Sequence, residues 1–160
     1  MSKLIIIRGP LGVGKSTVSK YLAHHIQAEY ISVDQVLKDN DLEAENGYVV
    51  EDFLKANKII LSELEKNFDR GTSVIVDGNF YFKEAIDDLV DNVSVDTQVF
   101  TLHAPLDICI ERDASREPPH GKDAAEFVYN AVAKVDFGKV IETADKATPQ
   151  VVMELEKLVK

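Results

Sequence analysis

The sequence predicts an α/β fold in which a parallel sheet lies between two layers of helices, a three-layer α/β/α arrangement. Short apolar runs, such as residues 4–7 and 73–76, alternate with longer segments whose apolar residues recur at helical spacing. This alternation favours strand–helix–strand units with parallel strands. Polar residues follow the first three runs directly, and open sheets of this kind bind ligands beyond the carboxyl ends of their strands.

Length and composition fit one ordinary globular domain over residues 1–160, with 45% hydrophobic and 29% charged residues. The net charge of −10 counts against a broad nucleic-acid surface, which needs clustered Lys and Arg. No apolar run is long enough to span a membrane, and the chain enters a strand without signal-peptide anatomy. Its single cysteine, Cys109, cannot form an internal disulfide. We therefore expect a cytoplasmic protein, a monomer or weak homodimer, with small-molecule ligands.

The stretch after the first strand fits the P-loop pattern of a glycine, four residues and Gly-Lys-Ser. Glycines let the backbone curl so that several N–H groups point at one phosphate, and the following helix N-terminus adds positive charge. Lys15 supplies a point charge for the β- and γ-phosphates, and Ser16 offers a hydroxyl to Mg²⁺. A chance match in a turn is the alternative. We expect ATP and Mg²⁺ to bind here, on Gly9, Pro10, Leu11, Gly12, Val13, Gly14, Lys15, Ser16 and Thr17.

Two acidic residues follow the next two predicted strands, residues 28–33 and 73–76. Asp34 stands where an acceptor hydroxyl would meet the γ-phosphate, and it also suits the N-cap of the next helix; the two roles are compatible. Asp77 is placed to hold a Mg²⁺-bound water, or else it forms an Asp-Gly turn. Gly78 would let substrate approach the backbone, and Asn79 is a weaker candidate for acceptor contacts.

Residues 35–69 read as a long, mainly helical insertion that Asn46-Gly47 interrupts and Arg70-Gly71 ends. Residues 49–68 carry an apolar stripe at helical spacing. Residues 37–48 are polar and poorly periodic, which fits a surface patch or a mobile cap over the substrate.

The second half predicts helices at 82–91, after Pro105, at 123–134 and from Thr148, and strands at 97–103 and 138–143. Arg112 and Arg116 are four residues apart and would share one helix face, either clamping phosphoryl charge or pairing with nearby acids. Pro118-Pro119-His120-Gly121 then breaks the helix and suggests a lid, to which Lys122 could add a cation. For three further side chains we expect a structural role more than a functional one. Arg8 would be solvated or lie at the rim of the loop, His103 lies at a strand end, and Cys109 would pack in the interior.

On these motifs the chain resembles the P-loop kinases, particularly the compact shikimate, gluconate and chloramphenicol kinases and the adenylate-kinase group. The P-loop, Asp34, the Asp77-Gly78 pair and the arginines of residues 111–116 carry the resemblance. It implies the strand order 2-3-1-4-5, a cap at about 35–69 and a lid at about 114–124. It also implies that Arg112 lies against the adenine and Arg116 reaches the phosphates.

Two departures bear on the acceptor. Lys38, and no arginine, follows Asp34, so the anionic-substrate clamp of shikimate kinases and nucleoside-monophosphate kinases is in doubt. One glycine follows Asp77 where shikimate kinases have a glycine run, so we do not expect shikimate to be the substrate.

The leading functional hypothesis is transfer of the γ-phosphoryl group of Mg-ATP to a small-molecule hydroxyl. Lys15, Asp34 and Arg116 would be catalytic, and Ser16 and, through water, Asp77 would hold Mg²⁺. The acceptor would bind at Asp34, Lys38, Gly78 and Asn79.

The alternatives are a nucleoside or nucleotide kinase, a polynucleotide kinase disfavoured by the charge balance, and a non-catalytic nucleotide switch. GTPase-type switches carry an Asp-x-x-Gly motif and an Asn-Lys-x-Asp motif that binds guanine. Residues 77–80 do not fit the first motif and residues 57–60 do not fit the second, so the sequence does not favour a switch.

Overall fold

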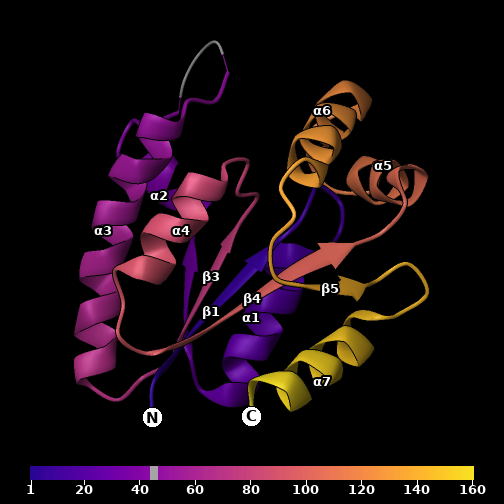
Figure 1. Ribbon diagram of the computed structural model, residues 1–160. Helices are drawn as coiled ribbons and strands as arrows, with labels where there is room; N and C mark the ends of the chain where they lie inside the picture. Colours follow the sequence, from indigo (N-terminus) through magenta and orange to yellow (C-terminus); the bar gives the residue numbers. More distant parts are fainter. Residues whose placement is uncertain (44–46) are drawn as a thin grey trace.

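The computed structural model describes residues 1–43 and 47–160. Within them, five parallel strands form one sheet in the order β2-β3-β1-β4-β5 (Figure 1). The strands are β1 (Lys3–Arg8), β2 (Glu29–Ser32), β3 (Val74–Gly78), β4 (Asp96–His103) and β5 (Lys139–Glu142). The fold class and the strand order predicted from the sequence are confirmed.

Helices cover both faces of the sheet (Figure 1). They are α1 (Lys15–Ile26), α2 (Val33–Asp39), α3 (Val50–Asp69), α4 (Lys83–Asp91), α5 (Leu106–Ala114), α6 (Lys122–Ala133) and α7 (Thr148–Val159). The cores on the two faces are separate. One contains apolar residues of α2, α3, α4 and α6, and the other contains those of α1, α5 and α7.

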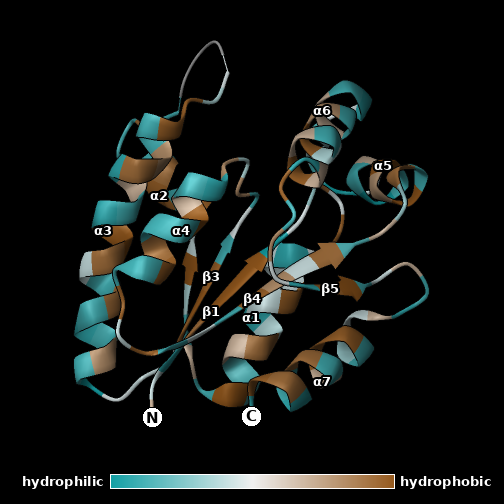
Figure 2. Ribbon diagram, in the orientation of Figure 1, coloured by the Kyte–Doolittle hydropathy of each residue, from teal (hydrophilic) through white to brown (hydrophobic). Residues whose placement is uncertain are grey.

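Strand β1 shows why the sheet is buried on both faces. Leu4 and Ile6 belong to the first core, whereas Ile5 and Ile7 belong to the second, because successive strand side chains point to opposite faces. A strand covered on both sides therefore reads as a continuous apolar run. Hydropathy colouring shows the strands as mostly hydrophobic and the outer helices as two-sided (Figure 2). None of the described helices is long and apolar enough to cross a membrane.

The predicted insertion at 35–69 consists of two helices, α2 and α3, with a connection between them. Asn46 of the predicted break lies outside the described residues. Arg70 is the C-cap of α3, and Gly71 follows with a left-handed φ of +76°, which confirms the predicted end.

Arg116 is not on a helix, contrary to the expectation that it shares a helix face with Arg112. Helix α5 ends at Ala114, and Ser115 is its C-cap. The buried carboxylate of Asp113 accepts hydrogen bonds from the amides of His120 and Gly121, at 3.3 and 2.9 Å, and thereby folds the following loop back onto the helix end.

Arg8 is neither solvated nor at the loop rim; it is 1% exposed. Its guanidinium donates to the carbonyls of Val132 and Val135 at the end of α6, at 2.9 and 2.8 Å, and to the Thr101 hydroxyl at 3.0 Å. Burial lowers its pKa to about 10, and the charge of Asp136 opposes the shift. Arg8 therefore ties the end of α6 to the sheet.

Candidate active site

The P-loop joins β1 to α1 and lines a cavity of about 420 Å³ at the carboxyl ends of the strands. Helix α1 begins at Lys15, and no described side chain caps its first turn, so its free amide groups are available to a ligand. Gly12 has a φ of +78°, and a β-carbon there would lie 2.1 Å from the Cys109 carbonyl of α5. Only glycine allows the loop to pack this closely. The lining residues are Leu11, Gly12, Gly14, Lys15, Ser16, Thr17, Asp34, Asp77, Arg112, Arg116 and His120.

Three residues expected to bind nucleotide do not line this cavity, namely Gly9, Pro10 and Val13. The Val13 side chain is buried in the core below the loop. The Pro10 carbonyl accepts a hydrogen bond from Lys15 Nζ at 3.2 Å. Val13 therefore anchors the loop in the core, and Pro10 holds Lys15.

Lys15 and two carboxylates form the charged floor of the cavity. Burial lowers the pKa of Lys15, while Asp77 and Asp34 oppose that shift. Asp77 is buried at the end of β3 and accepts a hydrogen bond from Tyr30 Oη at 2.7 Å. An incoming phosphate would offset the cost of burying the Lys15 charge. Ser16 and Asp77 offer oxygen ligands of the kind that Mg²⁺ prefers, so the donor set fits this ion.

The sequence allowed Asp34 to be the N-cap of α2, and this prediction is wrong. Ser32 is the N-cap, and its hydroxyl accepts from the Gln35 amide at 3.3 Å. Asp34 lies in the first turn, and its side chain is exposed in the P-loop cavity. The surrounding protein partly desolvates its carboxylate and so raises its pKa; Lys15 opposes this rise, and Asp77 and Glu43 add to it.

The two arginines of the α5–α6 region have different partners. Arg112 donates to the Thr143 carbonyl and hydroxyl, at 2.9 and 3.1 Å, and so links α5 to the loop after β5. Arg116 Nη1 lies 3.1 Å from Nδ1 of His120, which in turn lies 2.9 Å from Asp113 Oδ1. Burial alone would raise the Asp113 pKa, but hydrogen bonds from His120 and Gly121 outweigh it and lower that pKa.

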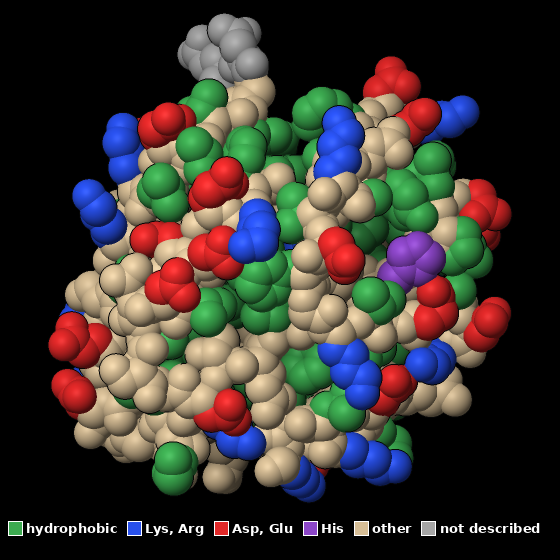
Figure 3. Space-filling view, viewed as in Figure 1, with side chains coloured by type: hydrophobic (Ala, Val, Ile, Leu, Met, Phe, Trp, Pro, Cys, Tyr) green, Lys and Arg blue, Asp and Glu red, His purple; other side chains and the backbone are tan. Residues whose placement is uncertain are grey.

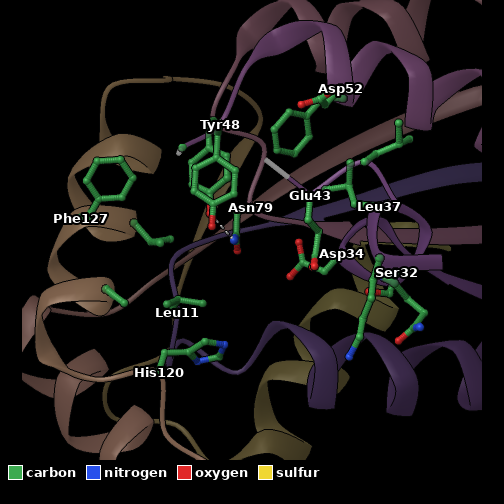
Figure 4. A pocket seen from close by; sticks show the side chains of 18 of the residues that line it. Leu11, Ser32, Asp34, Leu37, Glu43, Tyr48, Asp52, Asn79, His120 and Phe127 are labelled. Atoms are coloured by element: carbon green, nitrogen blue, oxygen red, sulfur yellow. Dashed lines mark hydrogen bonds between the residues drawn. The ribbon is translucent and has the colours of Figure 1, made fainter. Parts of the chain in front are cut away.

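A second, larger cavity of about 640 Å³ adjoins the first. Its walls come from α2, the start of α3, the segment after β3, and α6 (Figure 4). The space-filling view has a notch between the side of α3 and α4 and the side of α6, with hydrophobic side chains inside it (Figure 3). Asp34, Lys38 and Asn79, three of the four expected acceptor contacts, line this cavity.

Gly78, the fourth expected acceptor contact, lines neither cavity. A β-carbon there would lie 2.9 Å from Val33 Cγ2 and 3.0 Å from Phe80 Cε2. The close approach that Gly78 permits is therefore between β3 and α2, and not between backbone and substrate.

The two cavities share four lining residues: Leu11, Ser16, Asp34 and His120. His120 was expected only as part of the helix break and the lid at about 114–124, and no sequence signal gave its position at the junction. Tyr48, Phe127, Glu43 and Asp52 also line the larger cavity and were not singled out from the sequence. No sequence signal is common to these four: Tyr48 ends the polar stretch 37–48, and Phe127 is one of several apolar residues on its helix.

His103 lies outside both cavities. Its Nδ1 is 2.6 Å from Glu142 Oε2, which supports the structural role favoured from the sequence. Cys109 is fully buried, as expected. Among the described residues, no three His, Cys, Asp or Glu side chains gather as a metal site.

Comparison with known proteins gives a consistent result. A family model described as an AAA domain matches residues 4–135. A putative adenylate kinase from Thermococcus gammatolerans is 32% identical over 167 residues, which cover 98% of this chain and 85% of the relative. A shikimate kinase from Pseudoalteromonas translucida is 27% identical over 170 residues, which cover 88% of this chain and 96% of the relative. The crystal structure of a gluconokinase from Sinorhizobium meliloti has the same fold, with a TM-score of 0.77, 14% identity and coverage of 97% and 90%.

Proposed function

This chain belongs to the P-loop kinase family, and on that premise we propose that it transfers the γ-phosphoryl group of Mg-ATP to a hydroxyl of a small-molecule acceptor. The observation that carries the proposal is the junction of two cavities. The P-loop cavity offers uncapped helix amides and Lys15 to a triphosphate, the larger cavity has room for an acceptor, and Asp34 lines both.

The P-loop residues would bind the nucleotide. The free amides at the start of α1 and the Lys15 ammonium would hold the β- and γ-phosphates. Ser16, and Asp77 through water, would hold Mg²⁺, which neutralises phosphate charge when bound. Arg112 would lie beside the adenine, where it already holds the loop after β5.

Asp34 would orient the acceptor. In the transfer, the hydroxyl oxygen forms a bond to the γ-phosphorus while the bond to the β–γ bridging oxygen breaks and ADP leaves. The hydroxyl proton passes to the Asp34 carboxylate. Arg116 and Lys15 would stabilise the negative charge on the transferring group.

Residues 35–69 would act as the cap over the acceptor, and residues 114–124 as the lid over the nucleotide. Supporting this, Arg116 and His120 come from the α5–α6 loop and line the P-loop cavity. Closure there would exclude water, which competes with the acceptor for the phosphoryl group. The buried free thiol of Cys109 is consistent with our proposal of a cytoplasmic location and reducing conditions.

The test is ADP release from the purified protein with Mg-ATP and a panel of sugars, nucleosides, nucleotides and hydroxy acids. We expect at least one acceptor to raise the rate well above the background hydrolysis. The Asp34→Asn variant should lose that stimulation and keep ATP affinity. Full acceptor-dependent activity in Lys15→Ala would refute the assignment.

A further inference from the structure

The arginines of this chain are all positioned outside the larger cavity. Arg8 is buried against main-chain carbonyls, and Arg70 follows the end of α3. Arg112 and Arg116 line only the P-loop cavity. The sequence contains no other arginine. Carboxylates and phosphates are recognised best by the two parallel hydrogen bonds of a guanidinium, and the larger cavity has no such group for an acceptor.

Carboxylates dominate the charge of the larger cavity. Asp34, Glu43 and Asp52 line it, and Lys38 is the one Lys or Arg among its described lining residues. Figure 4 shows Asp34 and Glu43 directed into the same space. An anionic acceptor would meet like charge here, whereas an uncharged or cationic one would not.

Aromatic rings form the apolar part of the cavity. Tyr48 stacks on Tyr81 with ring centroids 4.3 Å apart, and Phe127 of α6 lies 6.4 Å from Tyr48 in a nearly parallel orientation. Tyr48 and Phe127 are 49% and 59% exposed, although both are large aromatic residues. A ligand with a planar ring can stack on these exposed aromatic side chains and so bury more of their apolar surface than a ligand without a ring.

Asn79 adds an unpaired polar atom. Its Nδ2 donates to Tyr81 Oη at 2.7 Å, and its Oδ1 has no partner among the described residues. The residue is 5% exposed and lines the larger cavity (Figure 4). Oδ1 is itself shielded from solvent, and a buried acceptor without a donor is costly; if the Asn79 amide turns toward the cavity, a ligand N–H or O–H would gain a hydrogen bond and remove that cost.

We propose that the larger cavity selects an uncharged or cationic hydroxyl compound with a planar ring and an N–H or O–H donor for Asn79, and that it rejects anionic acceptors. Nucleosides are the accessible representatives of this class. The inference rests on the proposed phosphoryl transfer and specifies its acceptor. It separates this chain from its relative named as a shikimate kinase, because shikimate carries a carboxylate.

The test uses matched acceptors that differ in charge. Each common nucleoside is compared with its 3′-monophosphate, which keeps the 5′-hydroxyl, and glucitol is compared with gluconate. We expect kcat/KM for each nucleoside to exceed that for its monophosphate about tenfold or more, since several carboxylates lie in the cavity. Glucitol should likewise exceed gluconate, with both below the nucleosides because they lack a ring. Equal or better rates with the anionic partners would overturn the inference.

Two sets of variants locate the cause. Glu43→Gln combined with Asp52→Asn should narrow the nucleoside-to-monophosphate ratio about fivefold, because two repulsive charges are lost. The control pair, Glu65→Gln with Asp69→Asn, changes net charge equally on the exposed part of α3 and should leave the ratio unchanged. Asn79→Leu should weaken nucleoside binding about tenfold without changing ATP binding.

Calorimetric binding in the presence of a non-hydrolysable ATP analogue separates this inference from the proposed function. Nucleosides that bind in preference to their monophosphates without raising ADP release would support the selectivity and refute phosphoryl transfer. Phosphorylation of anionic acceptors in preference to uncharged ones would support phosphoryl transfer and refute the selectivity. Failure of all uncharged ring compounds to bind would refute the inference.

Discussion

The two adjoining cavities are built in different ways. The P-loop cavity takes most of its lining from one continuous stretch, in which backbone amides and left-handed glycines supply the geometry. The larger cavity takes its lining from side chains of α2, α3, α6 and the segments between them. A phosphate site made of backbone tolerates little change in sequence, whereas a site made of side chains can be altered residue by residue. The nucleotide half should therefore be the fixed part and the acceptor half the adaptable one.

The largest effect should come from Lys15, which belongs to the fixed half. Lys15→Ala removes the point charge on the transferring group, and we expect kcat to fall by about 10³-fold or more. Stability should stay the same or rise, because a buried charge is lost. Steady-state kinetics and thermal unfolding measure the two quantities. Lys157→Ala, an exposed lysine of α7, is the control; a comparable loss of kcat there would show that the effect is not local.

Asp34 tests the junction itself. Asp34→Asn should lower kcat about 10²-fold, since the carboxylate no longer takes the hydroxyl proton. A raised pKa also means that ionised Asp34 destabilises the folded state, so stability is lost as the pH rises through that pKa. Asp34→Asn should accordingly unfold at a higher temperature than the native protein at neutral pH, and this difference should vanish below about pH 4, near the ordinary pKa of Asp. An equal difference at both pH values would contradict this account.

Asp113 tests how firmly the α5–α6 loop is held. Asp113→Asn places an amide group where two backbone N–H groups donate, and we expect a loss of about 1–3 kcal/mol in the free energy of unfolding. Because the native pKa of Asp113 is lowered, its contribution is present at neutral pH and is lost as the pH falls below about 4. Urea titrations at neutral and acidic pH measure the change. The KM for ATP should also rise, because Arg116 and His120 leave the cavity; an unchanged KM would separate the loop from nucleotide binding.

Gly78 should have the smallest effect on function. Gly78→Ala forces a β-carbon against Val33 and should cost about 1–3 kcal/mol of stability, with acceptor preference unchanged. Val33→Ala removes the methyl groups in the way, so Gly78→Ala should cost less in that background, and a double-mutant cycle by urea unfolding measures the coupling. Additive effects, or a changed acceptor preference, would return Gly78 to the list of acceptor contacts.

The contrast also explains what the sequence could predict. The strands and the P-loop each follow from a local sequence pattern. Apolar runs predicted the strands and hence the fold, and the spacing of the glycines predicted the P-loop. The end of α5 could not be foreseen, because it depends on the Asp113 carboxylate turning back to amides seven and eight residues away. Arg8 follows a strand in the sequence, and only the packing of α6 against that strand shows why it is buried.

The larger cavity, proposed as the acceptor site, was predictable only in part. Asp34 and Asn79 follow strands and were found from that position. Tyr48 and Phe127 lie 79 residues apart in sequence, and only the position of the segment before α3 relative to α6 brings their rings together. Gly78 was expected to let the substrate approach the backbone, but the groups that lie close to it are the side chains of Val33 and Phe80.

The shared lining at Leu11, Ser16, Asp34 and His120 has a consequence for inhibitor design. Two ligands that meet at one opening can be joined by a short linker that replaces the transferred group. The second half of such a conjugate then binds at an effective concentration in the millimolar range or above, without any new contact to the protein. A nucleoside joined through a short oligophosphate to adenosine should therefore bind far more tightly than either fragment, and its optimal linker length would report the distance between the two sites.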